Sequence, residues 1–297
     1  MVTLKTSWVR RQIGRIKPVT VHMSVELIRS VQDKVGSLGA KVMAGKMDVE
    51  IVDFPDFSAA FIHNKKPEVG KGVLLYLHGG GYVSGNIAYA QGFGNILADR
   101  TGRDVFCAAY RLAPEHPFPA ALEDALTAYE YLLSKGYTPD DIAFVGESAG
   151  GGLIYCLCLY LQDRGLPLPK ALVGISPWTD LTCSGGSYIN NSEKDPSLKE
   201  ELLRHYSFLY AGENVANPLV SPIFGNLSAL PPSLLFVGGD EIILDDTIML
   251  SKRLQECGSP CTLHIEEGLW HVYVLYPIAE AKAAWAEIVS FLEENSV

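Results

Sequence analysis

Residues Gly146 to Gly150 read GESAG and place Ser148 between small residues, after the apolar run DIAFV and before a helical run. This spacing fits the pattern G-x-S-x-G, in which a sharp turn from a strand into a helix exposes a serine hydroxyl. Small residues on either side relieve the crowding in that turn. A serine hydroxyl is a weak nucleophile at neutral pH and needs a base within hydrogen-bonding distance. The pattern therefore predicts a nucleophile at Ser148 and a partner base elsewhere in the chain.

Two histidines, His264 and His271, are the candidates for that base. In chains with this turn an acid and then a histidine follow the serine, which excludes the histidines that precede Ser148. His205 is excluded because it falls in a segment that we expect to cover the site. His264 lies inside the predicted strand 261–267, where its side chain points into one sheet face. His271 follows that strand in a loop, which can deliver it to the serine. We predict His271 as the general base, with a hydrogen-bonded structural histidine as the alternative.

The carboxylate that would orient His271 is expected at the end of the apolar run 233–239. Asp240 follows that run directly, where the carboxyl end of a strand presents it to the site. Three further acids stand at the start of the next helix: Glu241, Asp245 and Asp246. At that place capping and compensation of the helix dipole are the simpler roles. We predict Asp240 as the acid, and Asp180, which also follows a strand, stays the second candidate.

A second motif, HGGG, occupies residues 78–81 at the end of another predicted strand. Three consecutive glycines allow the backbone to turn N–H groups toward one point in space. Such groups can hold the oxyanion of a tetrahedral intermediate, and one donor of this kind is worth about 10²–10³ in rate. The motif lacks the G-x-x-x-x-G-K-[ST] spacing of a phosphate-binding loop. Together with Ser148 it predicts acyl transfer.

The elements that must position these residues alternate along the chain. Strands are predicted at 49–54, 58–64, 72–79, 104–110, 141–147, 171–178, 233–239 and 261–267. Helices are predicted at about 87–101, 119–135, 149–164, 245–257 and 276–294. Several strand runs are almost wholly apolar, as expected of strands covered on both faces. Strands separated by helices of this length imply right-handed crossovers and a mostly parallel sheet, with the first two runs as an antiparallel edge.

Two segments depart from this alternation. Residues 1–46 carry a helical pattern, with Ser24 as a plausible cap, and residues 183–216 insert another helix between two strands. We interpret both as a cap over the carboxyl edge of the sheet, and ordinary surface helices are the alternative. The domain prediction is therefore an N-terminal cap segment, 1–46, and a catalytic domain, 47–297.

Composition narrows the class of protein. The chain has 297 residues and a net charge of −10, which argues against a nucleic-acid partner because phosphate binding needs a basic face. Cys156 and Cys158 lie in an apolar stretch without histidines at zinc spacing and are predicted to be buried thiols. Charges interrupt the N-terminus, and no apolar run reaches the roughly 20 residues of a membrane span. These features predict a cytoplasmic protein without stable membrane insertion.

Seven stretches, in this order, resemble the bacterial hormone-sensitive-lipase-like esterases of the α/β-hydrolase fold: HGGGY, YRLAPEHPFPAALED, GESAGG, SPWTDLT, PLVSPIFG, GGDEIILDD and GLWHV. The resemblance runs from about residue 70 to the C-terminus. It implies an eight-stranded, mostly parallel sheet flanked by helices, with a helical cap. It assigns Ser148 as nucleophile, His271 as base and Asp240 as its orienting acid. It also assigns the oxyanion donors, which are the N–H groups of Gly80, Gly81 and Ala149.

The resemblance further implies a carboxylesterase that acts on small esters with short acyl chains, uses no metal or organic cofactor and often forms a homodimer. Two departures are visible: Glu147 precedes the serine where the family often has Asp or Thr, and the acid motif D-P-L reads Asp240-Glu241-Ile242. A related acyl hydrolase that acts on a lactone, an amide or an acetylated metabolite stays the alternative, because one triad serves all of these reactions. A ligand-binding protein that has lost catalysis would lack a triad member, and here all three residue types are present.

Overall fold

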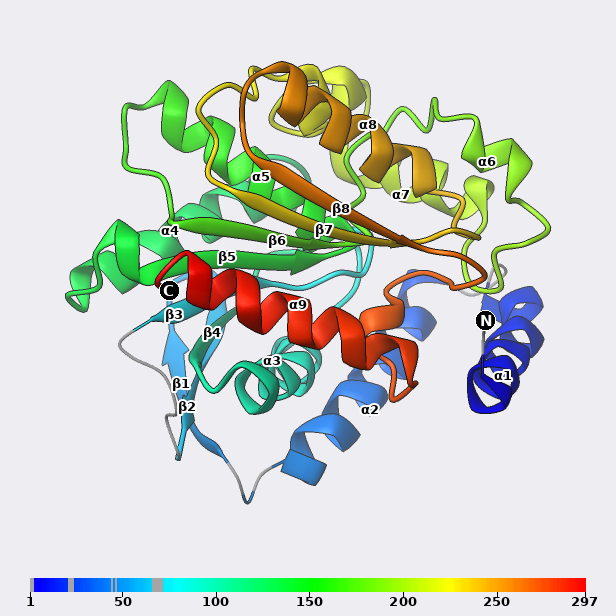
Figure 1. The fold of residues 1–297 in the computed structure, drawn as a ribbon, viewed down its shortest axis with the longest axis horizontal. Helices are drawn as coiled ribbons and strands as arrows, with labels where there is room; N and C mark the ends of the chain where they lie inside the picture. The colour runs from blue at the N-terminus through cyan, green and yellow to red at the C-terminus, as the bar shows by residue number, and fades with distance from the viewer. Residues whose placement is uncertain (1–2, 21–23, 44, 46, 66–71) are drawn as a thin grey trace.

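A twisted sheet forms the centre of the molecule (Figure 1). The computed structural model describes residues 3–20, 24–43, 45, 47–65 and 72–297. The sheet has eight strands in the order β1-β2-β4-β3-β5-β6-β7-β8. They are β1 (Met47–Asp53), β2 (Ser58–Asn64), β3 (Val73–Leu77), β4 (Asp104–Ala109), β5 (Ile142–Glu147), β6 (Ala171–Ile175), β7 (Ser233–Gly238) and β8 (Cys261–Glu266).

Strand direction follows the prediction. β1 pairs with β2, and β2 with β4, in antiparallel register, whereas β3 to β8 pair in parallel. Every residue of β3, β5, β6 and β7 is buried, which explains their continuous apolar sequences. The mostly parallel sheet with an antiparallel edge is confirmed.

Helices cover both faces of the sheet. On one side α3 (Ile87–Thr101) and α9 (Glu280–Glu294) pack against it, and the other side carries α4 (Ala120–Ser134), α5 (Ala149–Asp163) and α8 (Leu244–Glu256) (Figure 1). Alternate residues of one strand serve the two layers: Phe144 belongs to one apolar cluster and Val145 to the other. This alternation is the period of two expected of a strand.

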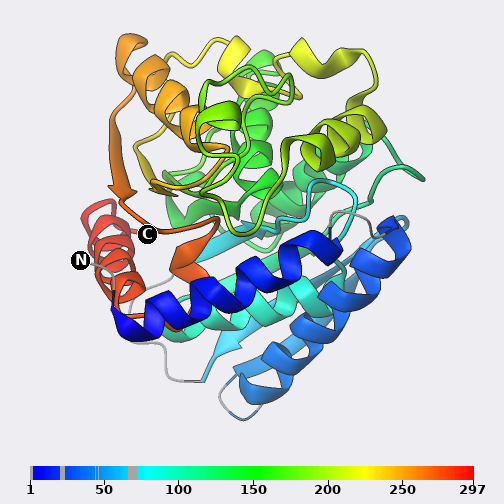
Figure 2. The same ribbon diagram turned by 90° about the vertical axis from the view of Figure 1, so that its right-hand side faces the viewer.

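The N-terminal helices lie at the carboxyl edge of the sheet. α1 (Leu4–Thr20) and α2 (Val25–Met43) are both visible from that edge in Figure 2. Arg10 of α1 contacts the loop after β8, and Arg29 of α2 donates to the carbonyl of Val83, which follows β3. Within the predicted cap segment, residues 1–2, 21–23, 44 and 46 lie outside the described residues.

The predicted insertion at 183–216 contains α6 (Ser187–Asn190) and α7 (Glu200–Ala211). α7 lies over the glycine loop, because Tyr210 stacks on Tyr82 with ring centroids 3.9 Å apart. The domain boundaries at 46 and 183–216 stay a prediction. None of the helices in the described part of the chain is long and apolar enough to cross a bilayer.

Candidate active site

Ser148 occupies a strained turn between β5 and α5. Its backbone has φ 54° and ψ −123°, a region that non-glycine residues rarely adopt and that costs about 1–3 kcal/mol. Two hydrogen bonds hold this turn: the Ser148 N–H donates to the Ile175 carbonyl at 3.0 Å, and the Trp178 N–H donates to the Ser148 carbonyl at 2.9 Å. The surrounding structure therefore holds the sharp turn that the motif predicts, with the serine side chain partly buried.

The glycines around Ser148 allow α5 to approach its neighbours closely. A Cβ atom on Gly150 would lie 2.0 Å from the Leu77 carbonyl oxygen, and one on Gly152 would lie 2.1 Å from the Trp178 carbonyl oxygen. Real Cβ atoms do not approach backbone this closely. The small residues are therefore required by the packing of the turn as well as by its conformation.

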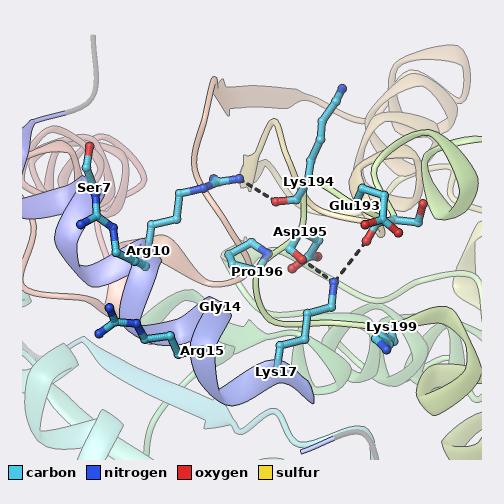
Figure 3. Close-up of a pocket in the computed structure, with 12 residues that line it drawn as sticks. Ser7, Arg10, Gly14, Arg15, Lys17, Glu193, Lys194, Asp195, Pro196 and Lys199 are labelled. Atoms are coloured by element: carbon cyan, nitrogen blue, oxygen red, sulfur yellow. Dashed lines mark hydrogen bonds between the residues drawn. The ribbon is translucent and has the colours of Figure 1, made fainter. Parts of the chain in front are cut away.

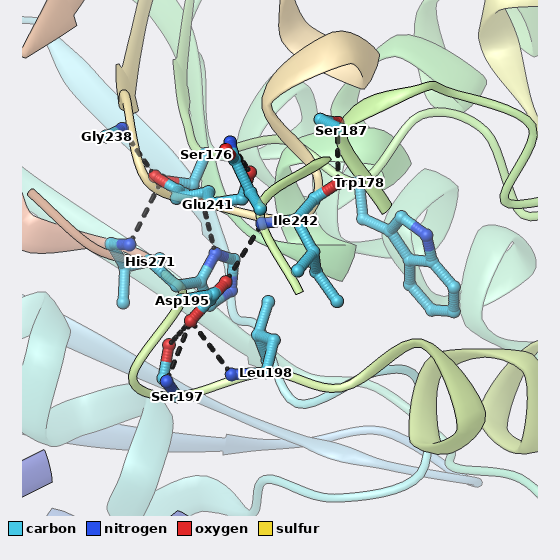
Figure 4. A network of polar contacts seen from close by, with 12 residues as sticks. Ser176, Trp178, Ser187, Asp195, Ser197, Leu198, Gly238, Glu241, Ile242 and His271 are labelled. Carbon is cyan, nitrogen blue, oxygen red and sulfur yellow. Dashed lines mark hydrogen bonds and ion pairs between the residues drawn. The ribbon is translucent and has the colours of Figure 1, made fainter. Parts of the chain in front are cut away.

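His271 and Glu241 form a buried pair (Figure 4). The His271 Nδ1 and Glu241 Oε2 atoms lie 2.8 Å apart, and Glu241 is fully buried. The other oxygen of Glu241 accepts from the Ser176 hydroxyl at 2.7 Å and from the Gly238 N–H at 2.5 Å. Because a carboxylate can only accept, Nδ1 carries the proton and Nε2 is left as a proton acceptor.

The prediction that Asp240 orients His271 is contradicted by this geometry. Asp240 instead forms an ion pair with Arg10, with Oδ2 and Nη2 2.8 Å apart. The reason lies in the turn after β7: the Glu241 N–H donates to the Gly238 carbonyl at 3.2 Å, while the Glu241 carboxylate accepts the Gly238 N–H. The turn thus folds Glu241 back under the strand end and leaves Asp240 toward α1.

The helix-cap role expected for Glu241 is also wrong, since α8 begins only at Leu244. A signal was present in the sequence. In the motif D-P-L two uncharged residues follow the acid, and Glu241 is followed by Ile242 and Ile243, whereas Asp240 is followed by a charged residue.

The second candidates for acid and base have other partners. Asp180 accepts hydrogen bonds from Thr182 and Ser184 within its own loop. His264 lies in β8 and stacks on Phe236, with ring centroids 5.1 Å apart. These contacts give both side chains structural roles, and the role of His271 as the base stays a prediction.

The glycine loop has the backbone geometry that its sequence predicts. Gly80 and Gly81 have φ of 111° and 63°, which favour glycine, and a Cβ on Gly81 would lie 2.4 Å from the Tyr206 ring. His78 braces the loop from below: its ring stacks on Tyr110 at 4.2 Å, and its Nδ1 lies 2.7 Å from the Gly79 carbonyl oxygen. Burial lowers the pKa of His78 to about 4, so the ring is neutral at physiological pH.

Glu147 links the glycine loop to the serine, a role that the sequence did not reveal. Its Oε1 accepts the Gly79 N–H at 2.7 Å. Burial raises the pKa of Glu147 to about 7, against the opposing effect of the hydrogen bond from the Gly79 N–H. The Ser148 N–H donates to the Ile175 carbonyl, and the next residue, Ser176, donates its hydroxyl to Glu241, so residues 175–176 connect the serine turn to the Glu241–His271 pair.

The described residues contain no group of three or more His, Cys, Asp or Glu side chains that could hold a metal ion. Cys156 and Cys158 are buried free thiols, as predicted.

Comparison with known proteins places the chain in a family. A family described by its α/β hydrolase fold matches residues 74–275. The chain belongs to this α/β-hydrolase family. The hydrolase is 40% identical over 204 residues to a protein named acetyl-hydrolase from Streptomyces hygroscopicus, a match that covers 68% of each chain.

Solved structures narrow the relationship. The hydrolase is similar to an esterase from the bacterial hormone-sensitive lipase family, with a TM-score of 0.88, 33% identity and 100% of both chains covered. It is also similar to the esterase EstE5, in a crystal soaked with p-nitrophenyl butyrate, with a TM-score of 0.90, 33% identity and 98% of both chains covered. The predicted resemblance and the assignment to the carboxylic ester hydrolases are confirmed.

Proposed function

We propose that the hydrolase is a serine-dependent carboxylesterase for small esters with short acyl chains, with Ser148, His271 and Glu241 as its triad. The observation that carries this proposal is the buried Glu241–His271 pair, which Ile175 and Ser176 connect by hydrogen bonds to the strained turn at Ser148. Glu241 takes the place that the sequence had suggested for Asp240.

In the first half of the reaction, His271 Nε2 accepts the proton of the Ser148 hydroxyl as its oxygen attacks the ester carbonyl. The Glu241 carboxylate holds the imidazole in the required tautomer and stabilises the imidazolium that forms. The tetrahedral intermediate collapses when the alcohol leaves with the proton from His271, and the acyl group stays on Ser148. Water then attacks the acyl-enzyme with His271 again as base, which releases the acid.

The oxyanion of the tetrahedral intermediate would accept hydrogen bonds from the N–H groups of Gly80, Gly81 and Ala149. Two features support this assignment. The Gly80 and Gly81 backbones have positive φ, and Ala149 is the first residue of α5, where a helix N-terminus favours negative charge.

The preference for short acyl chains is supported by two relatives: the Streptomyces protein is named an acetyl-hydrolase, and the EstE5 crystal was soaked with p-nitrophenyl butyrate. The alternative is a related acyl hydrolase that cleaves a lactone, an amide or an acetylated metabolite. The predicted cytoplasmic location and homodimer stay predictions.

The test is the Ser148→Ala variant assayed on p-nitrophenyl acetate and butyrate. We expect the loss of about 10³-fold or more in kcat, because the nucleophile is removed while the fold is kept. Circular dichroism checks the fold. Turnover at the wild-type rate would contradict the role of Ser148. A panel of matched esters, lactones and amides, assayed with the wild-type enzyme, separates the carboxylesterase from the alternatives.

A further inference from the structure

Arg10 of α1 bridges three segments that lie far apart in the sequence. Its Nη2 forms the ion pair with Asp240 and also donates to the Lys194 carbonyl at 2.6 Å, and its Nη1 donates to the Gly268 carbonyl at 2.7 Å. Figure 3 shows Arg10 reaching from α1 toward Lys194 at a cleft of about 660 Å³. The Arg10 side chain is only 28% exposed.

Two of these segments carry the proposed acid and base. Asp240 is the neighbour of Glu241, and Gly268 stands three residues before His271. The same segments also touch each other directly, because the Asp240 N–H donates to the Leu269 carbonyl at 3.1 Å. The Arg10 guanidinium therefore holds together the two turns on which the Glu241–His271 distance depends.

The third segment, which contains Lys194, contacts the turn that carries Glu241 from another side. Asn191 Nδ2 donates to the carbonyls of Gly239 and Glu241 at 3.1 and 2.9 Å. The buried Asp195 carboxylate accepts the Ile242 N–H at 3.0 Å (Figure 4). Through its hydrogen bond to the Lys194 carbonyl, Arg10 thus holds in place the segment whose side chains hydrogen-bond to the backbone around Glu241.

We propose that Arg10 is a positioning residue, through which the docking of helix α1 sets the geometry of the Glu241–His271 pair. The inference rests on the proposed function, since it names a device that serves the same site. Arg10 does not contact the Glu241–His271 pair but orders the backbone on both sides of it. Catalysis depends steeply on such order, because a misplacement near 1 Å can cost about 10²-fold in rate.

The test compares Arg10→Ala with Arg15→Ala, a matched change on the exposed face of the same helix, where Arg15 donates to Gln12. For Arg10→Ala we expect kcat on p-nitrophenyl butyrate to fall by about tenfold to 10²-fold with KM nearly unchanged. The low-field proton NMR signal of the His271 Nδ1–H should weaken or shift. Arg15→Ala should leave both readouts as in the wild type.

Asp240→Asn provides a second route that leaves α1 intact. It should reproduce part of the kcat loss, and Arg10→Ala added to it should cost less than it does in the wild type. Wild-type kcat and an unchanged low-field signal in folded Arg10→Ala would overturn the proposal. If Arg10→Ala does not fold, undiminished kcat in Asp240→Asn would overturn it instead. A wild-type enzyme that cleaves no ester would contradict the proposed function. The NMR signal of the His271 Nδ1–H would still test the positioning role of Arg10.

Discussion

At the scale of single residues, the site depends on which of two adjacent carboxylates lies under the end of β7. Glu241 is fully buried and accepts three hydrogen bonds, from Ser176, Gly238 and His271. Asp240 lies toward α1 with a side chain that is 19% exposed. A buried carboxylate with several donors holds an imidazole more rigidly than an exposed one, which makes Glu241 the effective partner of His271.

This difference predicts unequal effects of two neutral substitutions. Glu241→Gln should lower kcat by about 10³–10⁴-fold, because the amide can donate to Nδ1 and so favour the wrong imidazole tautomer. Asp240→Asn keeps Glu241 in place and should cost, through the looser turn, only part of the loss of about tenfold to 10²-fold expected for Arg10→Ala. Steady-state kinetics on p-nitrophenyl butyrate measure both. Larger losses for Asp240→Asn than for Glu241→Gln would restore Asp240 as the acid.

At the scale of elements, the close approach of α5 to the ends of β3 and β6 shapes the turn at Ser148. Gly150 faces the Leu77 carbonyl, and Gly152 faces the Trp178 carbonyl. A helix packed this tightly onto backbone cannot accept a methyl group without moving away. Any such movement would carry the proposed oxyanion donor Ala149 with it.

Gly150→Ala should therefore destabilise the protein by about 3 kcal/mol or more and lower esterase activity, because its Cβ would lie 2.0 Å from a backbone oxygen. Gly14→Ala is the matched control in helix α1, where the Cβ would lie at an ordinary 3.8 Å from the Pro196 Cβ. There alanine should stabilise by about 0.5–1 kcal/mol. Urea unfolding measures both, and equal effects would show that the contact at Gly150 has no cost.

At the scale of the whole molecule, the buried carboxyl group of Glu147, next to Ser148, makes the stability of the fold depend on pH. Glu147 is the last residue of β5, in the middle of the sheet, and is 1% exposed. Burial raises its pKa from the usual 4.5 to about 7. Ionising it inside the folded protein opposes global folding, so its effect extends beyond the active site.

The direction in which stability changes with pH follows from proton binding by Glu147. Between pH 4.5 and about 7 the folded protein holds a proton on Glu147 that the unfolded chain releases, so the free energy of unfolding falls as pH rises through this window. Glu147→Gln removes this dependence. Relative to the wild type, the variant should gain on the order of 3 kcal/mol between pH 4.5 and pH 8.

Urea unfolding at several pH values measures this gain. Glu130→Gln, which changes an exposed residue on α4, is the control and should show no such trend. A stability difference between Glu147→Gln and wild type that stays constant with pH would show that Glu147 is ionised throughout the window.

The amino-acid sequence by itself determined the sheet, its parallel and antiparallel parts and the turn at Ser148, and it was enough to propose His271 rather than His264 as the base. These features arise from local patterns: apolar runs, the spacing of glycines, and a histidine inside or beyond a strand. Only the tertiary structure decided between Asp240 and Glu241 and revealed Arg10 and the Glu147–Gly79 bond. Adjacent residues in a tight turn point in different directions. Which of them is buried depends on hydrogen bonds within that turn and on segments, such as α1, that are distant in the sequence.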